Sequence, residues 1–137
     1  MNAVNHVAVW TAGVLHFIIG AGWYTLLGRL WMTGIGKTQE QLMTEHGNSP
    51  LPYITALVCA LVVAYTLAWI LPKLGVQSAE TGARTGALLA LLFIGTTFAQ
   101  DYSFESRPVS LWFINAGYMI VGMAVMGAII GHWRKVK

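Results

Sequence analysis

Residues 53–71, YITALVCALVVAYTLAWIL, contain no charged side chain. About 20 apolar residues in an α-helix cross the hydrocarbon core of a bilayer, which is about 30 Å thick. Backbone polar groups in lipid must satisfy one another, and an α-helix satisfies them within a single segment. This stretch therefore predicts a transmembrane helix.

Three further stretches pass the same test of length and low charge, and Arg84 is the one charged side chain within them. The four predicted spans are about residues 3–27, 53–71, 82–99 and 111–133. No Lys or Arg precedes the first run, which also continues past the length of a signal h-region, so we expect it to be retained. The expected fold is all-α, an integral membrane bundle of four transmembrane helices.

The composition of the whole chain agrees with this fold. Of its 137 residues, 56% are hydrophobic and 9% are charged, and the mean hydropathy is +0.62. Soluble domains carry about 25% charged residues, so this chain has too few to cover a surface in water. Its length fits a single domain over residues 1–137. The Lys and Arg are scattered, apart from Arg134, Lys135 and Lys137, which predicts membrane anchors and no nucleic-acid partner.

The connection between the first two predicted spans, residues 28–52, is the longest of the three. Thr38 and Gln41 stand three residues apart within it, as in a capping box, and predict a short helix that ends near His46. Apolar residues on this helix would let it lie on the membrane surface. We therefore expect a short interfacial helix in the first loop.

The distribution of basic residues predicts the orientation. Four spans place both termini on one side of the membrane, and that side carries Lys73, Arg84, Arg134, Lys135 and Lys137. The other side carries Arg29, Lys37 and Arg107. By the positive-inside rule the N- and C-termini are cytoplasmic, and the first and third loops face outward.

Small residues recur at four-residue spacing in three of the predicted spans. Lipid gives apolar helices no hydrophobic reason to associate, so such residues favour pairing by close backbone approach. The ladders are Ala56, Ala60, Ala64 and Ala68 in the second span, Gly82, Gly86 and Ala90 in the third, and Gly127 and Gly131 in the fourth. From them we expect the second and third helices to form a tight antiparallel hairpin.

His16 stands near the middle of the first predicted span. It belongs to a stripe at four-residue steps, which comprises Ala8, Ala12, His16, Gly20 and Tyr24. An ionisable side chain at this depth is costly unless it faces the bundle interior or a wet cavity, which makes His16 a functional candidate. The alternative is a neutral structural imidazole, hydrogen-bonded to Tyr118 or to a Thr hydroxyl.

Polar and aromatic residues collect near the outer ends of the predicted helices. They are Trp23, Tyr24 and Arg29 of the first, Thr96, Thr97, Gln100 and Asp101 of the third, and Trp112 and Asn115 of the fourth. The aromatic rings are typical of an interfacial belt, whereas the amides of Gln100 and Asn115 need hydrogen-bonding partners. Asp101, Glu105 and Arg107 are close enough in sequence to pair with one another or with Arg29. These charges indicate either an ion-paired cap on the loop or an entry site for a substrate or ion.

Familiar catalytic and cofactor patterns are missing from the sequence, including the P-loop, the dinucleotide-binding glycine motif, the nucleophile elbow and HExxH. His6 and His132 belong near the cytoplasmic ends of their spans, where they could form a pair, whereas His16 lies near the middle and His46 in the outer loop. No two share a helix face at ligand spacing and Cys59 is the single cysteine, so we expect no metal site and no cofactor. A membrane enzyme acting on lipid or quinone would have Asp101, Glu105 and His16 as acid–base groups. About 15 Å of helix separates mid-membrane from the helix end, too far for them to act on one bond. We therefore favour a non-enzymatic protein.

Two segments carry a family resemblance. The first helix contains HFIIGAGWY at residues 16–24, followed by LGRLW at 27–31 and GKT at 36–38, and a later segment runs from FESRP at 104–108 to FINAGY at 113–118. Together they resemble a bacterial membrane family known as domain of unknown function 1761, which implies a four-helix protein with no assigned activity. The residues that match its pattern are Trp23, Tyr24, Trp31, Glu105, Arg107, Asn115 and Tyr118.

Our leading hypothesis is binding or translocation of a small molecule or ion. Four helices rarely enclose a pore alone, so it predicts a homo-oligomer, most simply a two-fold dimer, in the bacterial cytoplasmic (inner) membrane, in contact with lipid. Its candidate binding residues are His16, Trp23, Tyr24, Trp31, Gln100, Asp101, Glu105, Arg107, Asn115 and Tyr118. The alternative is an accessory or assembly subunit of a larger membrane complex. A cavity between Tyr24, Asn115 and His16 favours the first hypothesis, and a packed interior favours the second.

Overall fold

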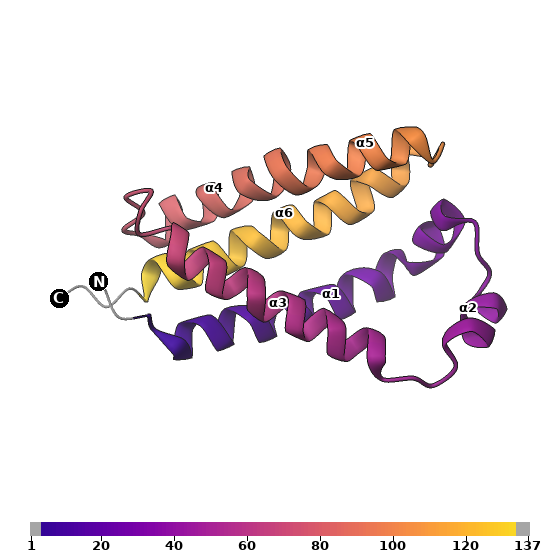
Figure 1. Cartoon of the computed structure of the whole chain (residues 1–137), viewed down its shortest axis with the longest axis horizontal. Coiled ribbons are helices and arrows are strands. Elements are labelled where there is room, and N and C mark those ends of the chain that lie inside the picture. Colours follow the sequence, from indigo (N-terminus) through magenta and orange to yellow (C-terminus); the bar gives the residue numbers. More distant parts are fainter. Residues whose placement is uncertain (1–3, 134–137) are drawn as a thin grey trace.

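The computed structural model describes residues 4–133, and in this part of the chain every regular element is a helix. Arg134, Lys135 and Lys137, which entered the count of basic residues, lie outside the described residues. The elements, in chain order, are α1 (His6–Ile35), α2 (Gln39–His46), α3 (Leu51–Ile70), α4 (Ala79–Leu89), the π-helix η1 (Ala90–Gly95), α5 (Thr96–Phe104) and α6 (Val109–His132) (Figure 1).

Four helical segments are long and apolar enough to cross a membrane, which confirms the expected fold class. They are His6–Ile35, Leu51–Ile70, Ala79–Phe104 and Val109–His132. The third is one continuous span in which α4, η1 and α5 follow one another without a break. The second and fourth begin and end within two residues of the predicted bounds, whereas the third is longer than predicted at both ends.

The first span also differs from its predicted bounds, because α1 continues past Leu27 to Ile35. The segment from Gly28 to Ile35, expected in the loop, is helical, and it holds no proline that would break the helix. The helix ends at Gly36, whose φ of 70° suits a residue without a side chain. There the N–H of Gly36 donates to the Thr33 carbonyl at 3.2 Å, and the N–H of Lys37 donates to the Met32 carbonyl at 3.0 Å. A helix of 30 residues is about 45 Å long, so it extends beyond the hydrocarbon core.

The short helix α2 begins and ends where the sequence predicts. Its capping box is complete: the Thr38 hydroxyl accepts from the Gln41 N–H at 3.2 Å, and the Gln41 side chain accepts from the Thr38 N–H at 2.8 Å. Lys37, just before the helix, pairs with Glu45 in its last turn and holds the pKa of that carboxyl below its ordinary value. No residue of α2 is buried, as expected for a helix at the membrane surface.

The prediction that the second and third spans form a tight hairpin is wrong, because α4 packs along α6 instead. The backbones of these two helices touch. A Cβ atom built on Gly82 would overlap the carbonyl of Gly127, and one built on Gly86 would overlap the carbonyl of Met123. The glycine ladder of the third span therefore faces the glycine ladder of the fourth.

The alanine ladder of α3 has a different partner, α1. Ala60 and Ala64 are buried, and Leu61 lies so close to Gly13 that a Cβ there would contact its side chain at 2.8 Å. On its other side α1 packs against α6, so α1 holds α3 beside the α4–α6 pair.

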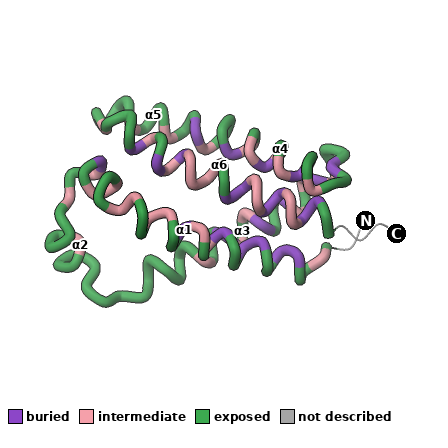
Figure 2. The backbone as a smooth tube through the Cα atoms, turned by 180° about the vertical axis from the view of Figure 1, so that it is seen from behind, coloured by how far each residue is buried: buried purple, intermediate pink, exposed green. Residues whose placement is uncertain are grey.

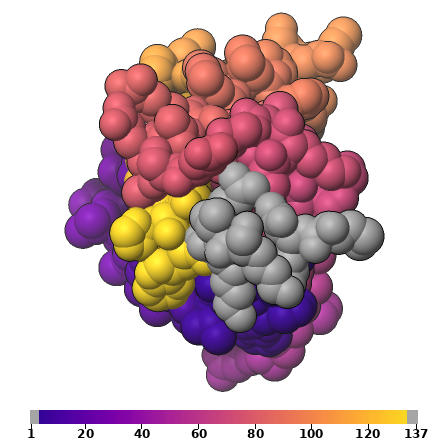
Figure 3. Space-filling view, turned by 90° about the vertical axis from the view of Figure 1, so that its left-hand side faces the viewer, coloured from indigo at the N-terminus to yellow at the C-terminus, as the bar shows by residue number. Residues whose placement is uncertain are grey.

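The core lies in the half of the bundle that contains the start of α1 and the end of α6. Its members include Val9, Leu67, Leu71 and Met126, and Figure 2 shows the buried residues gathered toward that end. In Figure 3 the start of α1, the end of α6 and the α3–α4 turn lie together at that end. There the Asn5 side chain donates to the Trp133 carbonyl at 2.9 Å. The opposite half of the bundle is looser, and it contains a cavity.

Candidate ligand-binding site

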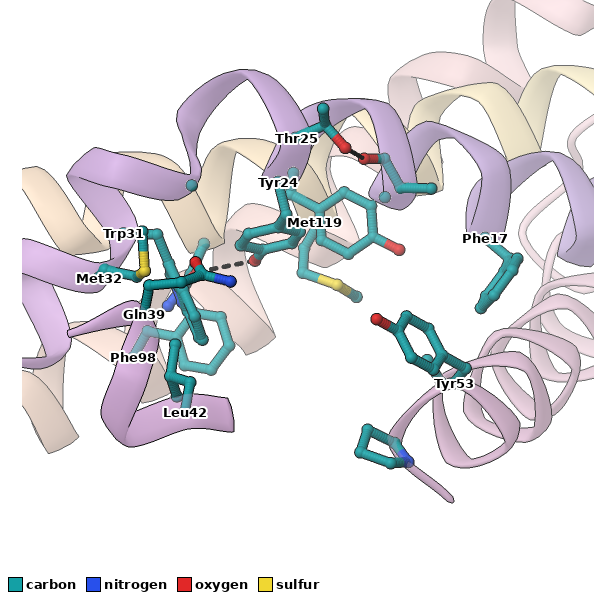
Figure 4. A pocket seen from close by; sticks show the side chains of 17 residues that line it. Phe17, Tyr24, Thr25, Trp31, Met32, Gln39, Leu42, Tyr53, Phe98 and Met119 are labelled. Carbon is teal, nitrogen blue, oxygen red and sulfur yellow. Dashed lines mark hydrogen bonds between the residues drawn. The ribbon is translucent and has the colours of Figure 1, made fainter. Parts of the chain in front are cut away.

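A cavity of about 930 Å³ opens at the end of the bundle that carries α2. It lies where the first turns of α3 diverge from α1 and α6 (Figure 1). In the close-up of Figure 4, Phe17 and Tyr53 lie on one side of the space, Trp31, Met32 and Leu42 on the other, and Tyr24 and Met119 between them. A volume of this size accommodates a small molecule.

Most of the residues that line the cavity are aromatic, aliphatic or glycine, and none of them is charged. They are Phe17, Gly20, Ala21, Tyr24, Thr25, Gly28, Trp31 and Met32 of α1, Gln39 and Leu42 of α2, Pro52, Tyr53 and Ala56 of α3, Phe98 of α5, and Asn115, Tyr118 and Met119 of α6. Such a lining is typical of pockets for apolar ligands, in which a few polar groups fix the orientation.

Asn115 is the polar centre of this lining. Its side-chain oxygen accepts a hydrogen bond from the Tyr24 hydroxyl at 2.7 Å, marked by a dashed line in Figure 4. Its amide nitrogen donates to the Tyr102 hydroxyl, also at 2.7 Å. The Tyr102 ring is stacked on Phe98, with centroids 5.5 Å apart. One amide thus links α1, α5 and α6 at the cavity.

Tyr118 connects the cavity to the interior of the bundle. Its ring lies edge-on to Tyr24 at 5.5 Å and stacks on His16 at 4.6 Å, and its hydroxyl donates to the His16 backbone carbonyl at 3.2 Å. Gly20 makes room for it, because a Cβ at that position would lie 2.8 Å from the Tyr118 hydroxyl. The missing side chain at residue 20 therefore sets the position of the Tyr118 ring.

His16 is only 4% exposed and does not line the cavity. Its stripe is confirmed, since Ala8, Ala12 and Gly20 are also buried and Tyr24 is half-buried. The expected hydrogen bond from the imidazole to Tyr118 or a threonine is not formed, and the ring is held by stacking instead. Its Nδ1 atom lies against Gly122 and makes no hydrogen bond.

The two tryptophans of the family pattern have different surroundings. The Trp23 indole donates to the Ile114 carbonyl at 3.0 Å, and its ring lies over Gly117, so it fastens α1 to α6. Trp31 lines the cavity and lies edge-on to Tyr24, with centroids 5.9 Å apart.

Gln100 and the charged candidates lie outside the cavity. Gln100 and Asp101 are exposed on α5. Arg107 lies in the α5–α6 turn and pairs with Glu105 at 3.0 Å. It also donates to the carbonyl of Ile35, the last residue of α1, at 2.7 Å. The expected pairing is therefore confirmed for Glu105 and Arg107, and Arg107 also joins this turn to the end of α1.

Only four of the lining residues, Tyr24, Trp31, Asn115 and Tyr118, were among the candidates. The others were not: Phe17, Gly20, Ala21, Thr25, Gly28, Met32, Gln39, Leu42, Pro52, Tyr53, Ala56, Phe98 and Met119. A signal for those on α1 was present. An α-helix has 3.6 residues per turn, so steps of four drift around it, whereas alternating steps of four and three stay on one face. That alternation leads from Phe17 through Ala21, Tyr24 and Gly28 to Trp31. The residues on α3, α5 and α6 gave no comparable signal.

Metal binding has no support from the described residues, in which no three His, Cys, Asp or Glu side chains come together. Comparison with known proteins adds a family but no activity. The family model described as protein of unknown function (DUF1761) matches residues 7–131, nearly the whole chain. No curated protein and no solved structure matches the chain.

Proposed function

Because the chain belongs to the DUF1761 family, whose description assigns no activity, we propose a function from the cavity: the protein binds a neutral, largely apolar small molecule within the membrane. The observation that carries this proposal is the lining, which is rich in aromatic residues, has one hydrogen-bonded amide near its centre and includes no charged residue.

The uncharged lining argues against the ion considered from the sequence. An ion in an apolar cavity loses its hydration and needs charged or strongly polar partners in exchange. The nearby charges of Glu105 and Arg107 are already engaged with each other and with the Ile35 carbonyl. A neutral ligand needs no such partner.

The packing of the other half of the bundle supports binding over translocation by a single chain. Val9, Leu67 and Met126 are almost fully buried there. They belong to a contiguous core, which leaves the cavity open at the end that carries α2. In this proposal the ligand enters and leaves on one side.

A two-fold dimer in the bacterial inner membrane, with cytoplasmic termini, completes the proposal. One chain leaves the cavity open, and a second copy is the simplest cover for it. The alternative of an accessory or assembly subunit rested on small-residue ladders and an aromatic surface that would dock on a larger complex. Gly82, Gly86 and Gly127 are instead used between α4 and α6 of the same chain, so these glycines no longer argue for an external partner.

A matched pair of variants tests the proposal. A Cβ on Gly28 or on Gly22 meets no atom within 4 Å, so both positions tolerate a larger side chain. Gly28 lines the cavity and Gly22 does not. Gly28→Leu adds a side chain to the cavity wall and takes up part of the space for a ligand, whereas Gly22→Leu makes the same change on the exposed face of the same helix.

Native mass spectrometry of the protein released from mild detergent measures any bound small molecule. We expect wild type and Gly22→Leu to carry a neutral ligand that Gly28→Leu has lost, with equal thermal stability of the two variants. Equal ligand content in both variants, or no ligand in wild type, contradicts the proposal.

A further inference from the structure

Two half-buried donors that line the cavity have no acceptor among the described residues: the indole N–H of Trp31 and one N–H of the Asn115 amide, which lies nearer the other polar groups of the site. The Tyr24 hydroxyl donates to Asn115, the Tyr118 hydroxyl to the carbonyl of His16, and the Thr25 hydroxyl to the carbonyl of Ala21 at 2.6 Å. Each of these hydroxyl groups of α1 and α6 therefore already donates a hydrogen bond.

Asn115 is different, because a primary amide carries two N–H donors. One of them binds the Tyr102 hydroxyl. The second has no acceptor among the described residues, and it belongs to a half-buried side chain that lines the cavity. Exchanging the oxygen and nitrogen of this amide still leaves one N–H without an acceptor, since each tyrosine hydroxyl can either donate or accept.

A donor without a partner in apolar surroundings is more costly than an acceptor that makes one bond of the two it can accept. The missing partner is thus an acceptor. It is also uncharged, because no cation lies among the lining residues to balance an anion. The rings of Tyr24, Trp31, Tyr118 and Phe98 provide apolar walls for the rest of such a molecule.

We propose that the ligand carries an uncharged carbonyl oxygen on an apolar body, and that Asn115 donates its free N–H to this oxygen. This inference rests on the function proposed above. Two sources in a membrane have this chemistry: the ester carbonyl of a lipid and the ring carbonyl of a quinone.

The test uses two probe pairs, each differing in the carbonyl. Monoolein is compared with its alkyl-ether analogue, and menadione with 2-methylnaphthalene. The protein is placed in nanodiscs of ether lipids, which contain no ester carbonyl, and the dissociation constant of each probe is measured by titration.

In wild type we expect the carbonyl member of at least one pair to bind about tenfold more tightly, as for one hydrogen bond between uncharged groups. The pair that shows the preference identifies the source. Asn115→Leu is expected to bind both members equally. Gly22→Leu, on the exposed face of α1 outside the cavity, leaves the Asn115 donor in place and is expected to retain the preference.

Two results overturn the inference: no preference for the carbonyl in either pair in wild type, or a preference that survives in Asn115→Leu. If Asn115→Leu fails to fold, Asn115→Asp serves in its place at a pH where the carboxyl is ionised, because it has no N–H to donate. A failure of the proposed function can be told apart from a failure of this inference. If the cavity is not the binding site, Gly28→Leu binds every probe with the same dissociation constant as wild type.

Discussion

At the scale of single residues, His16 fits between α1 and α6 because residue 122 has no side chain. A Cβ on Gly122 would overlap the imidazole Nδ1 atom. The ring has little room to move, since its other face is stacked on Tyr118. The contact between His16 and Gly122 is therefore steric, and its energy can be separated from that of the surrounding packing.

Gly122→Ala is expected to lower the free energy of unfolding by about 1–3 kcal/mol, the usual cost of inserting a methyl group into a packed interior. In a His16→Ala background the same change is expected to cost almost nothing, because the ring that meets the new methyl group is absent. Reversible unfolding in mixed detergent and SDS measures both values. An equal cost in the two backgrounds would show that His16 does not occupy this space.

At the scale of elements, the pairing of α4 with α6 depends on contact between two backbones. The carbonyl of Gly127 faces Gly82, and a backbone carbonyl cannot move aside as the end of a side chain can. Gly95 lies in the same span, but a Cβ there meets its nearest atoms at 3.5 Å, an ordinary distance. Gly82 and Gly95 thus form a test position and its control.

Gly82→Ala is expected to push α4 away from α6 and to cost about 3 kcal/mol of unfolding free energy, at the upper end for overpacking. Gly95→Ala is expected to leave stability unchanged or raise it, because Ala favours a helix over Gly by about 0.5–1 kcal/mol. The same unfolding measurement compares them. Similar stabilities for the two variants would refute the backbone contact.

At the scale of the whole molecule, the start of α1, the end of α6 and the α3–α4 turn lie at one end of the bundle, and α2 with the α5–α6 turn at the other (Figure 1). Asn48 and Gln77 are exposed residues of the connections at opposite ends. Neither carries a charge, so a cysteine at either position leaves the count of basic residues unchanged. The pair therefore reports the orientation in the membrane.

In a Cys59→Ser background, we expect a membrane-impermeant maleimide to label Asn48→Cys in intact cells whose outer membrane has been permeabilised. Gln77→Cys is expected to react only after lysis, since the positive-inside rule places its loop in the cytoplasm. The reverse pattern would mean that the protein has the opposite orientation, with the cavity opening to the cytoplasm.

What the sequence alone determined is local. Residues 53–71 had to form a spanning helix because lipid offers backbone groups no other partner, and Thr38 and Gln41 cap α2 through neighbouring atoms. Family membership was also foreseeable from short segments of the chain. In each case the residues that determine the feature lie close together in the sequence.

Only the tertiary structure decided which helices pair and where the cavity lies. The ladders at Ala60 and Gly82 both signalled close approach, but small residues do not specify a partner, and the partner is set by how two whole surfaces fit. The π-helix η1 likewise ends in a contact with another helix, since the Trp112 indole of α6 donates to the Gly95 carbonyl at 2.7 Å. Phe17, Tyr53 and Phe98 line one cavity because α3 diverges from its neighbours. That divergence results from the packing of the whole bundle and has no local pattern in the chain.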